Sequence, residues 1–270
     1  MVADCSTVFN FPRRARVNAM PLASPLCFLL PRLAIATTLL HFAVIALVVS
    51  GLKASAEETP APSVTEVSAD RHPELTRLSP TEEVWIDAKA KEVLVGGKIA
   101  IDKGPIEFFA CPKDTKEHES IVAVRSSARL IHTALLAIGL QPGKPVAFDP
   151  AYVPASGAVV RVTMRWIDAK KQVTQEARAQ DWIRNTKTGK ATEEEWVFAG
   201  SSLWTDSTTG KDYYQADGGD LICVSNFPTA MLDLPVKSSQ SNQALLFEAF
   251  EERVPPHDTE VEIIFSAGKN

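Results

Sequence analysis

Residues 106–139 read IEFFACPKDTKEHESIVAVRSSARLIHTALLAIG, and this stretch decides the class of fold that we expect. Ile106 to Cys111 is an apolar and aromatic run that predicts a β-strand, and Ile121 to Val124 predicts a second strand after a polar turn. From the serines onward the apolar residues recur at helical spacing. This change of period predicts a buried helix over about residues 126–139, capped by one of the two serines at its start.

The sequence on both sides predicts more short strands. VVRVTMRW, at Val159 to Trp166, alternates apolar and polar residues, as a half-buried strand does. Gly96-Gly97 lies between two β-branched runs, at residues 92–95 and 98–102, and predicts a tight hairpin there.

Two further segments complete the prediction of the fold. SNQALLFEAF, residues 241–250, predicts a second short helix, and Glu260 to Phe265 predicts a closing edge strand. Most links between the predicted strands are too short for parallel crossovers. We therefore expect an α+β domain with a mainly antiparallel β-sheet, one buried helix and the second short helix.

Composition and charge are those of a globular protein and argue against nucleic acid as a partner. Of the 270 residues, 45% are hydrophobic and 23% are charged. The net charge is −5, and because residues 1–56 are basic, the rest of the chain carries the acidic excess. An acidic body repels phosphate backbones, and the sequence has no basic stripe with interleaved aromatic residues.

Residues 33–50 read LAIATTLLHFAVIALVVS, an uncharged run that arginines precede and Ala54-Ser55-Ala56 follows. This arrangement predicts a signal peptide that is cut after Ala56. The run also approaches the ~20 residues that span a bilayer, so residues 33–52 can instead anchor the chain in the cytoplasmic membrane. Both alternatives predict a body that is exported to the periplasm or cell envelope.

The remaining chain divides into a linker and one domain. Residues 57–82 contain four prolines, many acidic residues and few large apolar ones, so they predict a flexible spacer. Residues 83–266 are long enough to bury a single core, and we expect one globular domain there.

Five stretches of this domain carry specific motifs: FFACPKDTKEHESIVAV at 108–124, LLAIGLQPGKPV at 135–146, EARAQDWIRNTKTGK at 176–190, WVFAGS at 196–201 and GGDLICVSNFPTAMLDLP at 218–235. These motifs resemble those of one family, the YdjY-domain proteins. Those exported proteins, numerous in planctomycete bacteria, have no settled biochemical function. The resemblance implies an envelope protein and carries over no catalytic residue. Some relatives are named as iron–sulfur proteins, but a cluster needs four cysteines and only two follow the leader, so we expect no cofactor.

Cys111 and Cys223 allow three interpretations. An even pair of cysteines in an exported protein suggests a disulfide between them. Two separate buried thiols are the alternative, because cysteine packs well as a small apolar residue. The third interpretation is chemistry at one or both sulfur atoms.

His118 is the natural partner for such chemistry. It follows Cys111 by seven residues, so two neighbouring strands joined by a turn would bring them together, and an imidazole can activate a thiol. With Cys223, and with His132 added, the pair also makes a weak candidate for a zinc site, although no CxxC or HxxxH spacing supports it. A histidine at the start of a strand is more often a hydrogen-bonded structural residue.

Aromatic residues offer a different candidate site. The chain has five tryptophans, and aromatic side chains usually fill the cores of sheets. Trp204, beside the polar run TDSTTGK, and the pair Tyr213-Tyr214 are the ones that we expect to be exposed, as a platform for a sugar or peptide ligand.

Together these observations favour a non-enzymatic envelope module that binds a ligand or a partner protein. Trp204, Tyr213 and Tyr214 are its candidate binding residues, and a membrane contact is expected only through the N-terminal segment if it is not cleaved. The alternative is a thiol- or metal-dependent enzyme that uses Cys111, His118 and Cys223.

Overall fold

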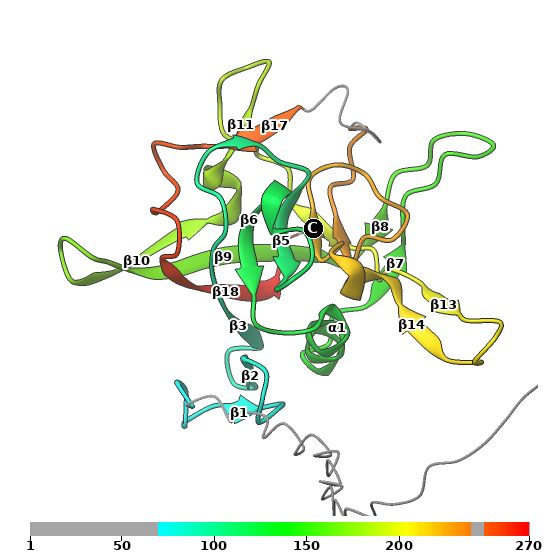
Figure 1. Cartoon of the computed structure of the whole chain (residues 1–270), viewed down its shortest axis with the longest axis horizontal. Helices are drawn as coiled ribbons and strands as arrows, with labels where there is room; N and C mark the ends of the chain where they lie inside the picture. Colours follow the sequence, from blue (N-terminus) through cyan, green and yellow to red (C-terminus); the bar gives the residue numbers. More distant parts are fainter. Residues whose placement is uncertain (1–69, 239–245, 270) are drawn as a thin grey trace, which may run out of the picture. The chain divides into compact units, whose positions relative to one another are not determined.

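The largest sheet of the structure closes on itself to form a small barrel (Figure 1). In this computed structural model, which describes residues 70–238 and 246–269, eight strands pair in the order β3, β18, β9, β12, β16, β15, β5 and β6, and β6 pairs back to β3. Neighbours are antiparallel except β15 with β16 and β5 with β6, which are parallel. The barrel strands are β3 Glu92–Ile99, β5 Phe108–Pro112, β6 Ser120–Val124, β9 Val159–Asp168, β12 Trp196–Phe198, β15 Ile222–Cys223, β16 Leu232–Asp233 and β18 Glu260–Ala267.

The other strands extend or decorate this barrel. In the large sheet, β2 pairs with β3, β1 pairs with β2, and β10 pairs with β9. Three small sheets join β11 with β17 and β4, β13 with β14, and β7 with β8. Their bounds are β1 Thr76–Arg77, β2 Val84–Asp87, β4 Gly104–Pro105, β7 Pro142–Lys144, β8 Ser156–Gly157, β10 Val173–Arg178, β11 Ile183–Asn185, β13 Leu203–Thr205, β14 Asp212–Tyr214 and β17 Phe247–Ala249. The helices are α1 Ala128–Ala137 and the 3-10 turns η1 Glu117–Glu119, η2 Ala179–Trp182 and η3 Gln215–Gly218.

The predicted α+β class is therefore wrong, because the described part of the chain is mostly β and has one α-helix. The pair β5–β6 shows how short links misled the prediction. Residues 113–119, which contain η1, bring the chain back to the start of β5, so Phe108 lies opposite Ser120 and Cys111 opposite Ala123. Two parallel neighbours thus need no long crossover here.

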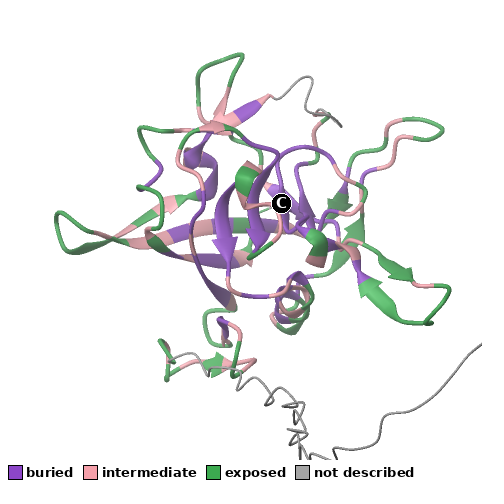
Figure 2. Ribbon diagram, viewed as in Figure 1, coloured by how far each residue is buried: buried purple, intermediate pink, exposed green. Residues whose placement is uncertain are grey.

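Buried apolar side chains fill the barrel, as the purple barrel strands in Figure 2 show. The largest fully buried side chains include Trp85, Trp182 and Trp196, so three of the tryptophans are core residues, as expected from the usual role of aromatic residues. Trp196 Nε1 donates a 2.8 Å hydrogen bond to the carbonyl oxygen of Cys223, which satisfies its polar group inside the core.

Helix α1 confirms the predicted change of period, within bounds slightly shorter than expected. Ser127 is the N-cap, and its hydroxyl accepts a hydrogen bond from the backbone N–H of Leu130 at 3.3 Å. Ile131 and Leu135 are buried on the face that packs against β2 and β3, whereas Leu136 is 41% exposed. Only one face of the helix is buried, which differs from the buried helix that we expected.

The predicted hairpin at Gly96-Gly97 is also wrong. Both glycines lie inside β3, which runs without a turn from Glu92 to Ile99. The absence of a side chain serves close packing here, because a Cβ atom at Gly97 would lie 2.7 Å from the backbone oxygen of Ala123 in β6.

The C-terminal part of the chain differs from the sequence prediction in two places. Phe247–Ala249 is strand β17 rather than the end of a second helix, and residues 241–245 of that predicted helix lie outside the described residues. The predicted edge strand is β18, which lies between β3 and β9 and is therefore central.

Residues 70–82, the second half of the predicted spacer, pack on the barrel. Trp85 Nε1 donates to the Asp70 carboxylate at 2.8 Å, and the His72 ring lies edge-on to the Trp85 indole at 5.0 Å. Thr76–Arg77 forms strand β1 on β2. A polar composition thus did not prevent ordering, because the segment contacts both the next strand, β2, and the distant strand β18.

The predicted leader, including residues 33–52, lies outside the described residues. Within residues 70–238 and 246–269, no helix has the length and apolar character needed to cross a bilayer.

Candidate functional site

The two cysteines of the domain are buried in neighbouring strands and carry free thiols in the structure. Cys223 packs in an apolar cluster with Phe108 and Ala230, whereas the Cys111 thiol lies near the hydroxyls of Ser120 and Thr115. Burial raises the pKa of both thiols. A nucleophilic cysteine needs a lowered pKa, so the geometry does not support thiol catalysis. The disulfide stays a prediction.

His118 does not join the cysteines. It lies in η1 with 77% of its side chain exposed, and its Nε2 is 3.8 Å from a carboxylate oxygen of Glu119. In the described part of the chain, no group of three or more His, Cys, Asp or Glu side chains is arranged to hold a metal ion. The structure therefore does not assemble the candidate metal site at Cys111, His118 and Cys223.

The aromatic candidates separate onto two faces of the β13–β14 hairpin. Trp204 and Tyr213 lie opposite each other in register, are 53% and 40% exposed, and have ring centroids 5.5 Å apart. Tyr214, the next residue, faces inward and is 7% exposed, because adjacent residues of a strand point to opposite faces. The prediction of exposure is confirmed for Trp204 and Tyr213 and is wrong for Tyr214.

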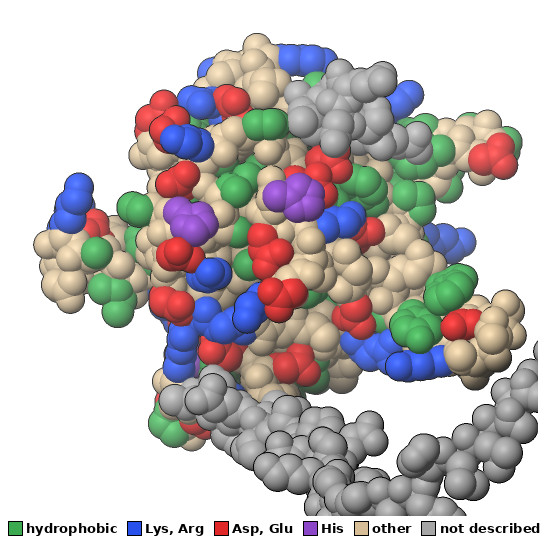
Figure 3. Space-filling model, in the orientation of Figure 1, with side chains coloured by type: hydrophobic (Ala, Val, Ile, Leu, Met, Phe, Trp, Pro, Cys, Tyr) green, Lys and Arg blue, Asp and Glu red, His purple; other side chains and the backbone are tan. Residues whose placement is uncertain are grey.

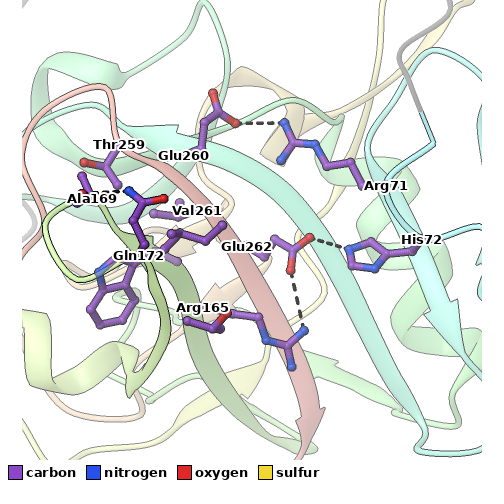
Figure 4. A pocket seen from close by; sticks show the side chains of 12 residues that line it. Arg71, His72, Arg165, Ala169, Gln172, Thr259, Glu260, Val261 and Glu262 are labelled. Carbon is purple, nitrogen blue, oxygen red and sulfur yellow. Dashed lines mark hydrogen bonds and ion pairs between the residues drawn. The ribbon is translucent and has the colours of Figure 1, made fainter.

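The cleft drawn in Figure 4 is a site that the sequence did not reveal. It has a volume of about 580 Å³, within the usual range for ligand sites. We call it the β9–β18 cleft. Its lining comes from the ends of β9 and β18, the β9–β10 hairpin and the N-terminal segment, and comprises Arg71, His72, Arg165, Trp166, Ile167, Ala169, Gln172, Thr174, Thr259, Glu260, Val261 and Glu262.

The two paired strands supply both apolar and charged residues to the lining of the cleft. Val261 lies opposite Trp166, and Glu262 lies opposite Arg165. Val261 is only 2% exposed, so the accessible apolar part consists mainly of Trp166 and of Ile167, whose aliphatic side chain is 60% exposed. The cleft therefore offers an apolar surface bordered by charges.

Those charges are paired with one another. The Glu262 carboxylate lies 2.5 Å from His72 Nε2 and 3.6 Å from the Arg165 guanidinium. Glu260 accepts from Arg71 at 2.9 Å and from Arg125 at 2.6 Å, and Figure 4 shows the Arg71 and His72 side chains meeting these two carboxylates.

Because these charged side chains are paired with one another, they are poorly suited to acid–base catalysis. Burial acts to raise the pKa of Glu260, but hydrogen bonds from Arg125 and Arg71 outweigh it and hold that pKa below its usual value. A carboxylate fixed in its ionised form by two arginines is not poised as a general acid. The arrangement is suited to ligand binding and to holding the segment that contains Arg71 and His72 against the barrel.

Strand β10 adds a feature beside the cleft. Among the described strands it pairs only with β9, so its other edge keeps unpaired backbone N–H and C=O groups. Gln172 and Thr174, at the start of β10, also line the cleft. The free edge of β10 faces away from β9, so it lies one strand beyond the β9 residues that line the cleft.

No pattern in the sequence predicts this cleft, because its charged border comes partly from the supposed spacer. The alternating Glu260, Val261 and Glu262 were visible as a strand pattern, but nothing local predicts that Arg71 and His72 contact them. The one available signal was a pair of basic side chains just before the domain and a pair of acidic ones in its last strand.

Comparison with known proteins gives one result. A family model described as the YdjY domain matches residues 84–266. No curated protein and no solved structure matches the chain.

Proposed function

The chain belongs to the YdjY domain family, and because that membership brings no reaction with it, we propose from the geometry that the domain is a non-enzymatic binding module for an extended segment of a partner protein. The free edge of β10 beside the β9–β18 cleft carries this proposal. An extended peptide can add a strand to such an edge through main-chain hydrogen bonds and place alternate side chains in a neighbouring pocket.

The chemistry of the cleft supports an uncharged apolar segment as the bound part. Trp166 and Ile167 would contact apolar side chains, and Gln172 and Thr174 would hydrogen-bond to the peptide. The border charges are already neutralised within the protein, so they give no preference for a charged ligand.

Replacement of Ile167 by glutamate should weaken peptide binding at least tenfold, because a charge would then have to be buried against the apolar part of the ligand. Random twelve-residue peptides displayed on phage would be selected on the immobilised full-length chain, and the enriched peptides titrated by calorimetry. Ile167 is 60% exposed, so the fold should tolerate the change.

Val153→Glu is the matched control, since Val153 is 55% exposed and lies outside the cleft. The proposal requires that Val153→Glu binds as the unmodified chain does. It fails if no peptide enriches, or if both variants bind the enriched peptides equally well.

We propose further that the domain acts outside the cytoplasm, as an exported protein of the planctomycete type. Support comes from the uncharged run at residues 33–50 and from the A-x-A pattern that ends at Ala56. Cleavage there would release the domain into the periplasm, whereas an uncleaved chain would remain anchored through residues 33–52.

The intact mass of the protein recovered from the extracytoplasmic fraction should correspond to a chain that starts at Glu57. The same measurement before and after reduction reads whether Cys111 and Cys223 are bridged. Recovery of the full 270-residue chain from the cytosol, with both thiols reduced, would contradict export.

A further inference from the structure

His132 in α1 has one ring nitrogen fixed by the protein and the other unused. Its Nδ1 lies 2.8 Å from the hydroxyl oxygen of Tyr214, and that hydroxyl lies 3.0 Å from the carbonyl oxygen of Gly200. The carbonyl can only accept, so Tyr214 must give its single proton to Gly200. His132 Nδ1 is then the donor to the Tyr214 oxygen, and in the neutral ring Nε2 is left as an acceptor.

The surroundings favour this neutral ring. Burial lowers the pKa of His132, and the edges of Phe198 and Tyr214 meet its ring with centroid distances of 4.8 and 5.4 Å. Burial also raises the pKa of Tyr214, which keeps its phenol protonated. Within the described part of the chain, His132 Nε2 has no hydrogen-bond partner.

A cavity of about 320 Å³ lies beside this pair, near the lower end of the usual range for small-molecule sites. We call it the His132 pocket, and it is separate from the β9–β18 cleft. It lies between α1 and the root of the β13–β14 hairpin, and its lining comprises Arg129, His132, Thr133, Gly200, Ser201, Ser202, Leu203 and Tyr214.

One wall of the pocket is held in an unusual backbone conformation. Gly200 and Ser201 are consecutive residues with φ angles of 91° and 56°. A serine with positive φ is uncommon and persists only where its surroundings fix it. Hydrogen bonds do so here, from the Ser201 hydroxyl to the Thr229 carbonyl oxygen at 2.6 Å and from its N–H to the Ala230 carbonyl oxygen at 2.9 Å. The wall is therefore preorganised.

The lining selects a type of ligand. Ser202 and Thr133 offer hydroxyl groups, and Leu203, 62% exposed, offers an aliphatic surface. The pocket has no carboxylate in its lining, and the one charged side chain, Arg129, already lies 3.7 Å from the Asp217 carboxylate. Donors, acceptors and an aliphatic patch without net charge suit a ring that carries several hydroxyl groups.

The opposite face of the same hairpin carries a second, separate aromatic surface. Trp204 and Tyr213 form an exposed aromatic pair there, and Figure 3 shows hydrophobic side chains gathered over β13–β14 with basic side chains beside them. Amphipathic aromatic rings contact the C–H faces of a polar ligand while leaving its hydroxyls in water.

We propose that the His132 pocket binds a neutral polyhydroxylated ligand of monosaccharide size, with one ligand hydroxyl donating a hydrogen bond to His132 Nε2. Leu203 packs against the aliphatic face of the ligand. This site is independent of the peptide-binding role proposed for the β9–β18 cleft.

Saturation-transfer NMR and calorimetry with the full-length chain test this, using D-glucose, D-galactose, N-acetyl-D-glucosamine and myo-inositol as probes. At least one probe should bind, and His132→Asn should weaken it at least tenfold. Asparagine can still reach the Tyr214 hydroxyl in place of Nδ1, but it has no group at the position of Nε2. Leu203→Asp, at an exposed position, should weaken the same probe without touching the core.

His118→Asn is the matched control, because the same change is made at a histidine whose side chain is 77% exposed and outside the pocket. It should leave binding unchanged. The proposal is overturned if none of the four probes binds, if His132→Asn and Leu203→Asp bind as tightly as the control, or if acetate competes for the site and thereby reveals an anion site.

Discussion

The unmodified chain should lose about 4 kcal/mol of folding stability as the pH rises from about 4 to about 7. The Asp233→Asn variant should not show this loss. Asp233 lies in barrel strand β16 and is fully buried. Burial raises the pKa of its carboxyl from 3.8 to about 7, despite hydrogen bonds from Asn226 Nδ2 and the Leu234 N–H. At about 1.4 kcal/mol per pH unit, this difference gives the expected magnitude.

The direction follows from which state holds the proton. Between pH 3.8 and about 7 the folded chain keeps a proton on Asp233 that the unfolded chain has released. Stability must therefore fall as the pH rises through this window, and it changes no further above the folded-state pKa. Asparagine does not titrate, and its oxygen can still accept the hydrogen bonds from Leu234 and Asn226.

Urea unfolding at pH 4 and at pH 8 gives the free energy of unfolding of Asp233→Asn and of the unmodified chain. The effect is the change, between the two pH values, in the difference between these free energies. Asp114→Asn is the control, since that side chain is 83% exposed, and its profile should follow the unmodified chain. If the stability of Asp233→Asn depends on pH as that of the unmodified chain does, then the Asp233 carboxyl does not keep its proton up to about pH 7 in the folded chain.

Local patterns predicted the local part of the fold. The helical spacing of Ile131, Ala134 and Leu135 gave α1, because a helix closes its hydrogen bonds within itself. Barrel closure depends instead on pairs such as Gly97 with Val124 and Glu262 with Arg165, which no local period encodes. The glycines were misread for the same reason, since a tight turn and a close approach between strands both require a missing side chain.

For the candidate site residues, too, local patterns predicted local features, and contacts between distant residues were not predictable. The polar run beside Trp204 was enough to predict that this residue is exposed, and the prediction also holds for Tyr213, but Tyr214 is buried and its hydrogen bond to His132 joins residues 82 positions apart. Both histidines had been weighed as partners for Cys111 and Cys223, yet the fold turns His118 to solvent and His132 toward a phenol. Residue type indicated which side chains to examine, and tertiary packing decided their partners.

Gly97→Ala should destabilise the domain by about 3 kcal/mol, at the upper end for adding a methyl group to a close-packed site. Gly97 pairs with Val124 of β6 on one side and with Val261 of β18 on the other, at the place where the barrel closes. The added Cβ would lie 2.7 Å from the backbone oxygen of Ala123 and 3.1 Å from a methyl group of Val122. A backbone oxygen held in a strand pair cannot rotate away, so β3 and β6 must separate.

Urea unfolding of the two chains measures this cost, and amide hydrogen exchange locates it, with the largest acceleration expected in β6. Gly218→Ala is the matched control, because a Cβ there meets nothing within 4 Å and its φ angle is not positive. That change should be neutral or stabilise by up to about 1 kcal/mol, because alanine restricts the unfolded chain. If Gly97→Ala proves as stable as Gly218→Ala, β3 and β6 do not approach this closely, and the barrel is open at that seam.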